Sequence, residues 1–219
     1  MERIIYNDIM KTGTDRTGIR TADNYIVTEW SGGLTTELAI APPGSIYADR
    51  LFDWRLSSAT VETEESIFTP LADYNRIIMS LTGPLRLQHD DGPWHELTAF
   101  MPHAFDGAAK TVSMGTVTDF NLMLRKGRCD GFVMPFRMQE GERVNLKSAL
   151  YETGEDIVYD TLILYAYHGE LAYGQTNGNT RTLRESETLM LENNTDVSDG
   201  MCNALTNVAA VLAGIRYIV

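Results

Sequence analysis

Phe52-Asp-Trp-Arg-Leu-Ser-Ser-Ala-Thr-Val61 is the stretch that decides the fold, because an extended strand here has two chemically different faces. Successive side chains of a strand point to opposite sides of a sheet. One face is bulky and apolar, with Phe52, Trp54 and Leu56. The other is small except for Arg55, and a guanidinium among small residues suits the wall of a pocket for a carboxylate or phosphate. The alternative is a half-buried strand whose Arg55 faces water.

Two further strands oppose an apolar face to a sparse polar one, namely Leu34-Thr-Thr-Glu-Leu-Ala-Ile40 and Thr118-Asp-Phe-Asn-Leu-Met-Leu124. Strict alternation places four polar residues on their second faces: Thr35, Glu37, Asp119 and Asn121. Gly32-Gly33 precedes the first of these strands. Glycine tolerates positive φ and close backbone approach, so this pair predicts a bulge or tight corner.

Length, charge and cysteine content limit the classes of protein to consider. The 219 residues suffice for one large all-β domain or two small fused ones. The net charge of -12, without a local basic stripe, would repel a phosphate backbone, so we expect no nucleic-acid partner. Cys129 and Cys202 form no disulfide framework, and the N-terminal residues lack a secretory pattern, which predicts a cytoplasmic protein.

The longest apolar run, Val208–Val219, is too short to span a bilayer and contains Arg216. It predicts a buried strand or packed tail, and we expect no membrane partner. Short strands with turn signals between them recur along the chain, beginning with Arg3–Met10, and no segment has a long helical stripe. We therefore predict an all-β fold.

An internal repeat relates two parts of the chain. Ile77–Leu87 resembles Ile163–Tyr173, and the offset of 86 residues also relates Leu97 to Leu183. Each copy contains a strand, a glycine turn, a short strand, a second turn and another strand. Two similar small β barrels are the simplest explanation of this repeat.

A set of motifs over roughly residues 25–130 resembles the HutD family in order and approximate spacing. The motifs are Trp30-Ser-Gly-Gly-Leu-Thr-Thr-Glu37, Phe52-Asp-Trp-Arg-Leu-Ser-Ser-Ala59, Phe68, the Arg76 segment, Phe105-Asp-Gly107 and Asp119-Phe-Asn-Leu-Met123. The resemblance implies a cupin-type (RmlC-like) double-stranded β-helix, a cytoplasmic location and a link to histidine utilisation as a small-molecule-binding or regulatory protein. A longer polar insert precedes Trp30, so the resemblance carries nothing onto residues 11–24.

Together, the repeat and the resemblance predict two tandem barrels in one chain, a bicupin. We expect residues 1–150 to form the first cupin-like half. Residues 151–219 would form the second, completed by an N-terminal strand.

The resemblance makes the polar faces a candidate ligand site, because the inward side of a closed barrel is shielded and polar groups there need partners or a ligand. The candidate residues are Thr35, Glu37, Arg55, Ser57, Arg76, Asp119 and Asn121. We expect one of the two arginines to hold a carboxylate, with Arg76 at a strand entrance. The hydroxyls and the amide would form hydrogen bonds, while the two carboxylates orient the arginines or recognise an amine or amide of the ligand.

The competing hypothesis is an internal salt-bridge network, in which Arg55 pairs with Glu37 or Asp119 and no ligand is needed. The two hypotheses differ on substitution. Arg55→Ala should abolish ligand binding in a folded protein if the site binds a ligand, but should mainly lower stability if the network satisfies itself.

A metal-dependent cupin enzyme is a second alternative. Such sites cluster neutral imidazoles with a carboxylate, often with two histidines one residue apart on a strand, and the chain has no such pair. His89 and His95 bracket the Asp90-Asp-Gly-Pro93 turn and could approach each other across a hairpin, beside Glu96. Histidines beside a turn are more often solvated, so we expect no metal and no cofactor.

Catalysis without a metal has little support in the sequence, and we assign no catalytic residue. Cys129 has basic neighbours that could lower its pKa, but it is expected to be a thiol in a surface loop. Asp119 could serve as the base of a metal-free isomerase or epimerase, although no histidine partner is evident nearby. A protein-interaction scaffold with an acidic surface is a further alternative.

The function we expect is binding of a small anionic metabolite. The resemblance alone suggests an intermediate of histidine breakdown, such as a formylated or imino derivative of glutamate, or urocanate. A homo-oligomer is compatible with this expectation.

Overall fold

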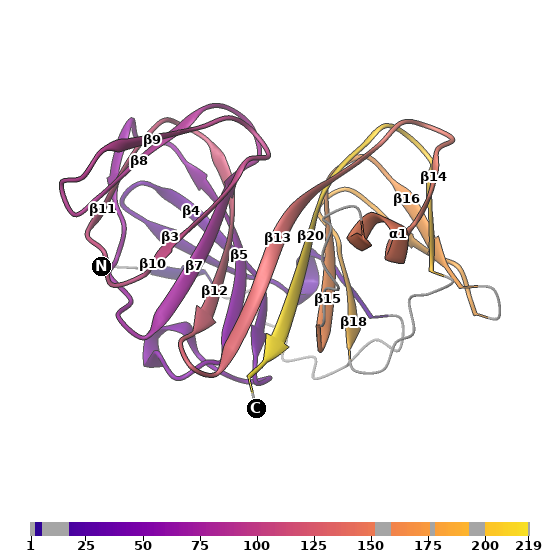
Figure 1. Ribbon diagram of the computed structural model, residues 1–219, viewed down its shortest axis with the longest axis horizontal. Helices are drawn as coiled ribbons and strands as arrows, with labels where there is room; N and C mark the ends of the chain where they lie inside the picture. Colours follow the sequence, from indigo (N-terminus) through magenta and orange to yellow (C-terminus); the bar gives the residue numbers. More distant parts are fainter. Residues whose placement is uncertain (1–2, 6–17, 152–158, 176–177, 193–199, 219) are drawn as a thin grey trace. The chain divides into compact units, whose positions relative to one another are not determined.

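The computed structural model describes residues 3–5, 18–151, 159–175, 178–192 and 200–218. Strands dominate this part of the chain (Figure 1). Its helical segments are a six-residue α-helix, α1 (Leu146–Tyr151), and two short 3-10 turns, Ala22–Asn24 and Tyr47–Asp49. The all-β prediction is confirmed. Within these residues no helix has the length and apolar character needed to cross a bilayer.

The chain forms two compact units, one containing Asp23–Met134 and the other Pro135–Arg216. In Figure 1 the strands of the first unit run from indigo to magenta, and those of the second are mostly orange and yellow. The division falls within β13 (Cys129–Met138). Each unit contains two sheets.

The first unit has a seven-stranded and a four-stranded sheet, in which neighbouring strands are antiparallel. The larger has the order β1 (Arg3–Ile5), β3 (Ile26–Trp30), β4 (Gly33–Ala41), β5 (Trp54–Val61), β12 (Thr118–Arg125), β7 (Tyr74–Ser80) and β10 (Pro102–Asp106). The smaller has the order β6 (Glu65–Ile67), β11 (Thr111–Met114), β8 (Leu85–His89) and β9 (Trp94–Leu97).

The second unit has a five-stranded and a four-stranded sheet. The larger has the order β13, β20 (Val208–Tyr217), β15 (Thr161–His168), β18 (Thr188–Glu192) and β2 (Ile19–Arg20). The smaller has the order β14 (Arg143–Asn145), β19 (Met201–Ala204), β16 (Leu171–Gly174) and β17 (Arg181–Leu183). The C-terminal apolar run therefore forms a strand, β20, as expected.

Strand pairing follows the internal repeat. Leu85 of β8 pairs with Leu97 of β9, and Leu171 of β16 pairs with Leu183 of β17, so both partners keep the 86-residue offset seen in the sequence. All four leucines are buried. The four-stranded sheets also share one order, since β6-β11-β8-β9 corresponds to β14-β19-β16-β17.

The core of the first unit lies between its two sheets. Ile78 of β7 packs with Leu85, Leu87 and Leu97 of the smaller sheet, and Phe68 and Phe105 cover the cluster as half-buried rings. Burial of large aliphatic side chains contributes about 1.5–3 kcal/mol each to stability. The core thus joins the smaller sheet to the seven-stranded sheet, whose strands carry the candidate site residues.

Three local predictions were wrong. Phe52 does not share a face with Trp54, because β5 begins at Trp54 and Phe52 instead packs with Tyr74 and Met123. Arg76 does not stand at a strand entrance, because β7 begins two residues earlier, at Tyr74. Cys129 is not a surface thiol, because it opens β13 and is buried.

Two further expectations concern the N-terminal region. The predicted strand Arg3–Met10 is seen at Arg3–Ile5, and residues 6–10 lie outside the described residues. Most of the polar insert, residues 11–17, also lies outside them.

Candidate functional site

Strand register places the predicted polar residues on one face of the seven-stranded sheet. Directly opposed residues of antiparallel strands share a face. Asn121 of β12 is opposite Ser57 of β5, which in turn is opposite Glu37 of β4. Met123 of β12 lies between Arg55 on one side and Arg76 on the other. We call this surface the polar face, formed by Glu37, Arg55, Ser57, Arg76, Asp119 and Asn121.

The polar face is shielded from solvent, since its six residues have exposed fractions of only 3–7%. Thr35 is half-buried, opposite Ala59 and two residues along β4 from Glu37. It lies at the edge of the polar face. Six of the seven predicted residues therefore form one buried group, with Thr35 beside them.

Arg55 and Glu37 form a buried ion pair. Arg55 Nε donates a hydrogen bond to Glu37 Oε2 at 2.7 Å, and Arg55 Nη1 donates to Ser57 Oγ at 3.3 Å. The guanidinium also lies 4.2 Å above the centroid of the Tyr47 ring. Arg55 is thus held and neutralised by its own neighbours, as the salt-bridge hypothesis predicted for this residue.

Arg76 is different, because its charge is buried without an ion pair among the described residues. Its Nε has no hydrogen-bond partner there. The guanidinium carbon lies 4.8 Å from the Phe68 ring centroid and 5.2 Å from that of Phe105. Burial lowers the pKa of Arg76 to about 10, although nearby Tyr47 and Asp119 favour its charged form. Arg76 therefore stays cationic at neutral pH.

Asp119 has an unusual proton affinity. Burial raises the pKa of its carboxyl to about 7, while the charge of Arg76 and a hydrogen bond from the backbone of Ala59 oppose that rise. At neutral pH this carboxyl is therefore partly protonated. It cannot fully neutralise Arg76.

Other groups beside the polar face also lack partners. Asn121 Oδ1 and Arg50 Nη1 are buried without a hydrogen bond to another described residue. The Arg50 guanidinium stacks on Tyr47, with 3.8 Å between its carbon and the ring centroid. Buried polar groups are normally hydrogen-bonded, so unmatched donors and an unmatched acceptor beside excess positive charge fit an anionic, hydrogen-bonding ligand.

Sequence reasoning missed Tyr47 and Arg50 as neighbours of the site. They lie in the loop between β4 and β5 and carry no periodic pattern. Phe68 and Phe105 were part of the family motifs but were not assigned to the site. Phe105 of β10 is directly opposite Arg76 of β7, so it lies on the same face of the sheet. Alternation along β10 was the available sign of that placement.

A separate pocket of about 390 Å³ lies at the β3–β4 turn and β6. It is lined by Trp30, Ser31, Gly32, Thr63, Glu65, Ser66, Ile67 and Thr69. None of the seven predicted residues lines it. No lysine, arginine or histidine lines it, so an anion has a better-matched partner at the polar face.

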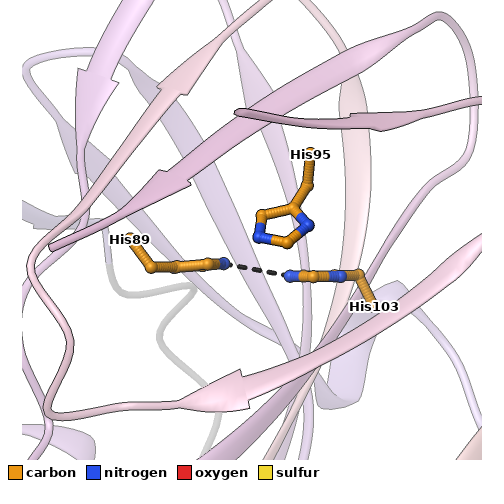
Figure 2. A group of neighbouring side chains, drawn as sticks. All are labelled: His89, His95 and His103. Atoms are coloured by element: carbon orange, nitrogen blue, oxygen red, sulfur yellow. Dashed lines mark hydrogen bonds between the residues drawn. The ribbon is translucent and has the colours of Figure 1, made fainter. Parts of the chain in front are cut away.

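Three histidines meet beside the polar face, from the ends of three strands (Figure 2). His89 of β8 and His103 of β10 point at each other, with 3.0 Å between their Nε2 atoms, and His95 of β9 approaches this contact. One ring nitrogen from each lies within 4.8 Å of the others. Burial lowers the pKa of His89 and of His103, and the neighbouring histidines add to the effect.

His89 and His95 do approach each other across the hairpin, with 5.4 Å between ring centroids, and both are only partly exposed to solvent. His103 was missed as a member. Its strand pairs with β7, a partner distant in sequence, so local pattern gave no sign of the contact.

The family model of HutD matches residues 22–208. Solved structures with a similar fold include a conserved protein of unknown function, PA5104 from Pseudomonas aeruginosa PAO1, with 23% identity, a TM-score of 0.72 and coverage of 92% of this chain and 98% of that one. HutD from Pseudomonas fluorescens SBW25 (formate condition) has 20% identity, a TM-score of 0.66 and the same coverages of 92% and 98%.

A Cupin 2 conserved barrel domain protein from Leptotrichia buccalis has 8% identity and a TM-score of 0.51, covering 86% of this chain and 91% of its own. These likenesses show a cupin-like fold. No curated protein sequence matches the chain. The family match spans most of the sequence, including every strand of the polar face. The chain belongs to the HutD family.

Proposed function

We propose that the polar face binds a small anionic metabolite and that Arg76 is its main anion contact. The observation that carries the proposal is a buried guanidinium without an ion pair in the described structure, beside a carboxyl that is partly neutral at pH 7. A buried charge without a counter-ion is costly. A carboxylate ligand would supply the missing charge and accept from the planar guanidinium fork.

The remaining residues have distinct roles in this proposal. Glu37 fixes Arg55 in place, and Arg55 in turn reaches Ser57. Asn121 Oδ1 is a free acceptor, suited to an amine or amide hydrogen of the ligand. Thr35 supplies a hydroxyl at the edge of the face. The ligand we expect therefore has a carboxylate at one end and an N–H donor at the other.

HutD membership suggests where such a ligand would arise. We infer a link to the regulation of histidine utilisation in the cytoplasm, with formylated or imino derivatives of glutamate and urocanate as candidate ligands. Each combines a carboxylate with an N–H group, as the polar face requires. We also infer that each unit is a cupin barrel, making the chain a bicupin, because the two share a strand order in their smaller sheets.

Thermal denaturation with and without these compounds tests the proposal. A ligand at 100 times its dissociation constant should stabilise the folded protein by about 2.7 kcal/mol. Arg76→Met should lose this stabilisation. Arg86→Met is the matched control, because Arg86 forms an exposed ion pair with Glu96 in the same unit. Calorimetric titration should show one binding event that Arg86→Met retains.

The proposal fails if none of these carboxylates binds, or if Arg76→Met binds as tightly as Arg86→Met. If Arg76→Met still binds the ligand, a residue other than Arg76 makes the main contact with the anion. Absence of binding to any carboxylate would favour the self-satisfied network or the interaction scaffold.

A metal-free isomerase is a second candidate, favoured by one observation. A general acid or base works best with a pKa near the operating pH, and burial brings the pKa of Asp119 to about 7. Proton exchange next to the carboxylate of a bound ligand would reveal such activity. We would follow deuterium incorporation from heavy water by NMR, with Asp119→Asn as the inactive variant.

A further inference from the structure

We propose that His89, His95 and His103 bind one divalent first-row transition metal ion. The three imidazoles come from three different strands rather than from two histidines one residue apart on one strand. This inference concerns a different group of side chains from the proposed anion contact and does not depend on it.

The spacing of the nitrogens suits a metal. An imidazole nitrogen lies about 2.0–2.1 Å from zinc, so two nitrogens of one tetrahedral site are about 3.3 Å apart. His89 Nε2 and His103 Nε2 are already 3.0 Å apart, and a nitrogen of His95 lies within 4.8 Å of both. In the proposed site, rotation of the His95 side chain would bring the third nitrogen to bonding distance. Figure 2 shows His95 directed at the contact between the other two.

A buried hydroxyl selects the tautomer that His89 needs. His89 Nδ1 is 2.8 Å from Thr111 Oγ1, and that hydroxyl donates to the carbonyl oxygen of Ala109 at 3.3 Å. Because the hydroxyl proton is used in this way, Thr111 Oγ1 accepts the Nδ1 proton of His89. The lone pair of His89 then lies on Nε2, the atom that faces His103. Orienting partners of this kind are typical of histidines that bind metals.

The composition of the cluster indicates which class of metal ion it suits. It contains imidazoles alone, a donor set that suits zinc, nickel, cobalt or copper better than magnesium or calcium. Three protein ligands leave at least one coordination position open. All three histidines are half-buried, so an ion has access from solvent.

The aromatic ring of Phe105 contacts both the histidine cluster and Arg76. Its centroid lies 4.6 Å from that of His89 and 5.2 Å from the guanidinium carbon of Arg76. The metal ion would therefore be held beside a hydrophobic ring.

The test is metal binding by the full chain, free of any histidine tag and stripped with a chelator. Titration with zinc or nickel should show one equivalent bound, and cobalt should give the visible absorption of a nitrogen-ligated ion. His103→Asn should weaken binding by at least about 100-fold, because even loss of an outer partner costs 10–100-fold. Thr111→Val removes the outer partner of His89 and should weaken metal binding by about 10–100-fold. Magnesium should not bind at this site.

His168→Asn is the matched control, because this fourth histidine is exposed on β15 and pairs with Glu185. It should keep wild-type affinity. If His103→Asn does not fold, His95→Asn measures the same loss. The inference is overturned if the wild-type chain binds no equivalent of zinc or nickel, or if binding survives replacement of all three clustered histidines.

Discussion

Arg55 Nε donates to Glu37 Oε2 at 2.7 Å, and both side chains are buried in the same face of the seven-stranded sheet. Arg76, on the same face, lacks such a partner in the described structure. The two arginines therefore have opposite energetic roles in the ligand-free protein. One is satisfied internally, and the other carries a charge that the fold leaves uncompensated.

Arg55→Met should strongly destabilise the protein, because it leaves the Glu37 carboxylate buried without its counter-charge. Breaking a buried ion pair in this way costs about 3–5 kcal/mol. Arg86→Met breaks an exposed pair and should cost about 1 kcal/mol or less. Urea unfolding of both variants measures the difference. Equal costs would show that the Arg55–Glu37 pair does not hold the polar face together.

Arg76→Met should instead leave the ligand-free protein as stable as the wild type, or more stable by about 1 kcal/mol. An unsatisfied buried donor costs about 1–3 kcal/mol, and removing the guanidinium removes that cost. The contacts of the guanidinium with Phe68 and Phe105 offset part of the gain. Asp119 is not stranded as a charge, because its carboxyl readily takes up a proton. A loss of several kcal/mol in urea unfolding would contradict this account.

Much of the fold could be predicted, because its strands follow local alternation and the repeat. The strands at Leu34–Ile40 and Thr118–Leu124 appear as β4 and β12, nearly as expected. Phe52 was misplaced because alternation cannot say where a strand begins. Cys129 was misplaced because its basic, glycine-containing surroundings resemble a loop, whereas β13 starts at that residue.

The candidate site was less predictable, because it depends on which strands pair. Alternation correctly grouped Arg55 with Ser57, and Asp119 with Asn121, but could not show that Glu37 would neutralise one arginine and leave the other free. The histidine cluster requires β10 to pair with β7, at a distance that no local pattern specifies. The ion pair and the histidine cluster can be identified only once the pairing and register of the strands are known.

Gly33→Ala should destabilise the first unit by about 3 kcal/mol or more, at the upper end of single substitutions. Gly33 has φ of +145°, and a Cβ atom there would lie 1.9 Å from the carbonyl oxygen of Thr60 on the neighbouring strand. The predicted close approach at this glycine pair is thus present. Gly44→Ala is the control, since φ is +86° but no atom lies within 4 Å, and strain alone should cost about 1–2 kcal/mol. Thermal unfolding of both variants compares them, and equal losses would rule out the steric explanation.

Asp119 should make stability fall as pH rises from about 4 to about 7. Its pKa in the folded protein is about 7, above the ordinary value of 3.8, so the folded state keeps a proton that the unfolded state has already lost. The stabilisation is complete below the unfolded pKa and is lost as pH rises through the folded one, amounting to about 4 kcal/mol at most. Asp119→Asn, which keeps an oxygen for the backbone hydrogen bond, should remove this slope.

Urea unfolding between pH 5 and pH 8 would measure the free energy of unfolding of the wild type and of Asp119→Asn. Subtracting one from the other removes the contributions of the other titrating groups and leaves the slope due to Asp119. Asp106→Asn is the control, because Lys126 lowers the pKa of this exposed carboxyl and any pH effect lies at more acidic values. The affinity for the anionic ligand should also fall as pH rises, since ionised Asp119 competes with the ligand for Arg76. The free energies of unfolding of the wild type and Asp119→Asn could instead differ by a constant amount over this range. Asp119 would then be ionised throughout, and the polar face would have no excess of positive charge to offer a ligand.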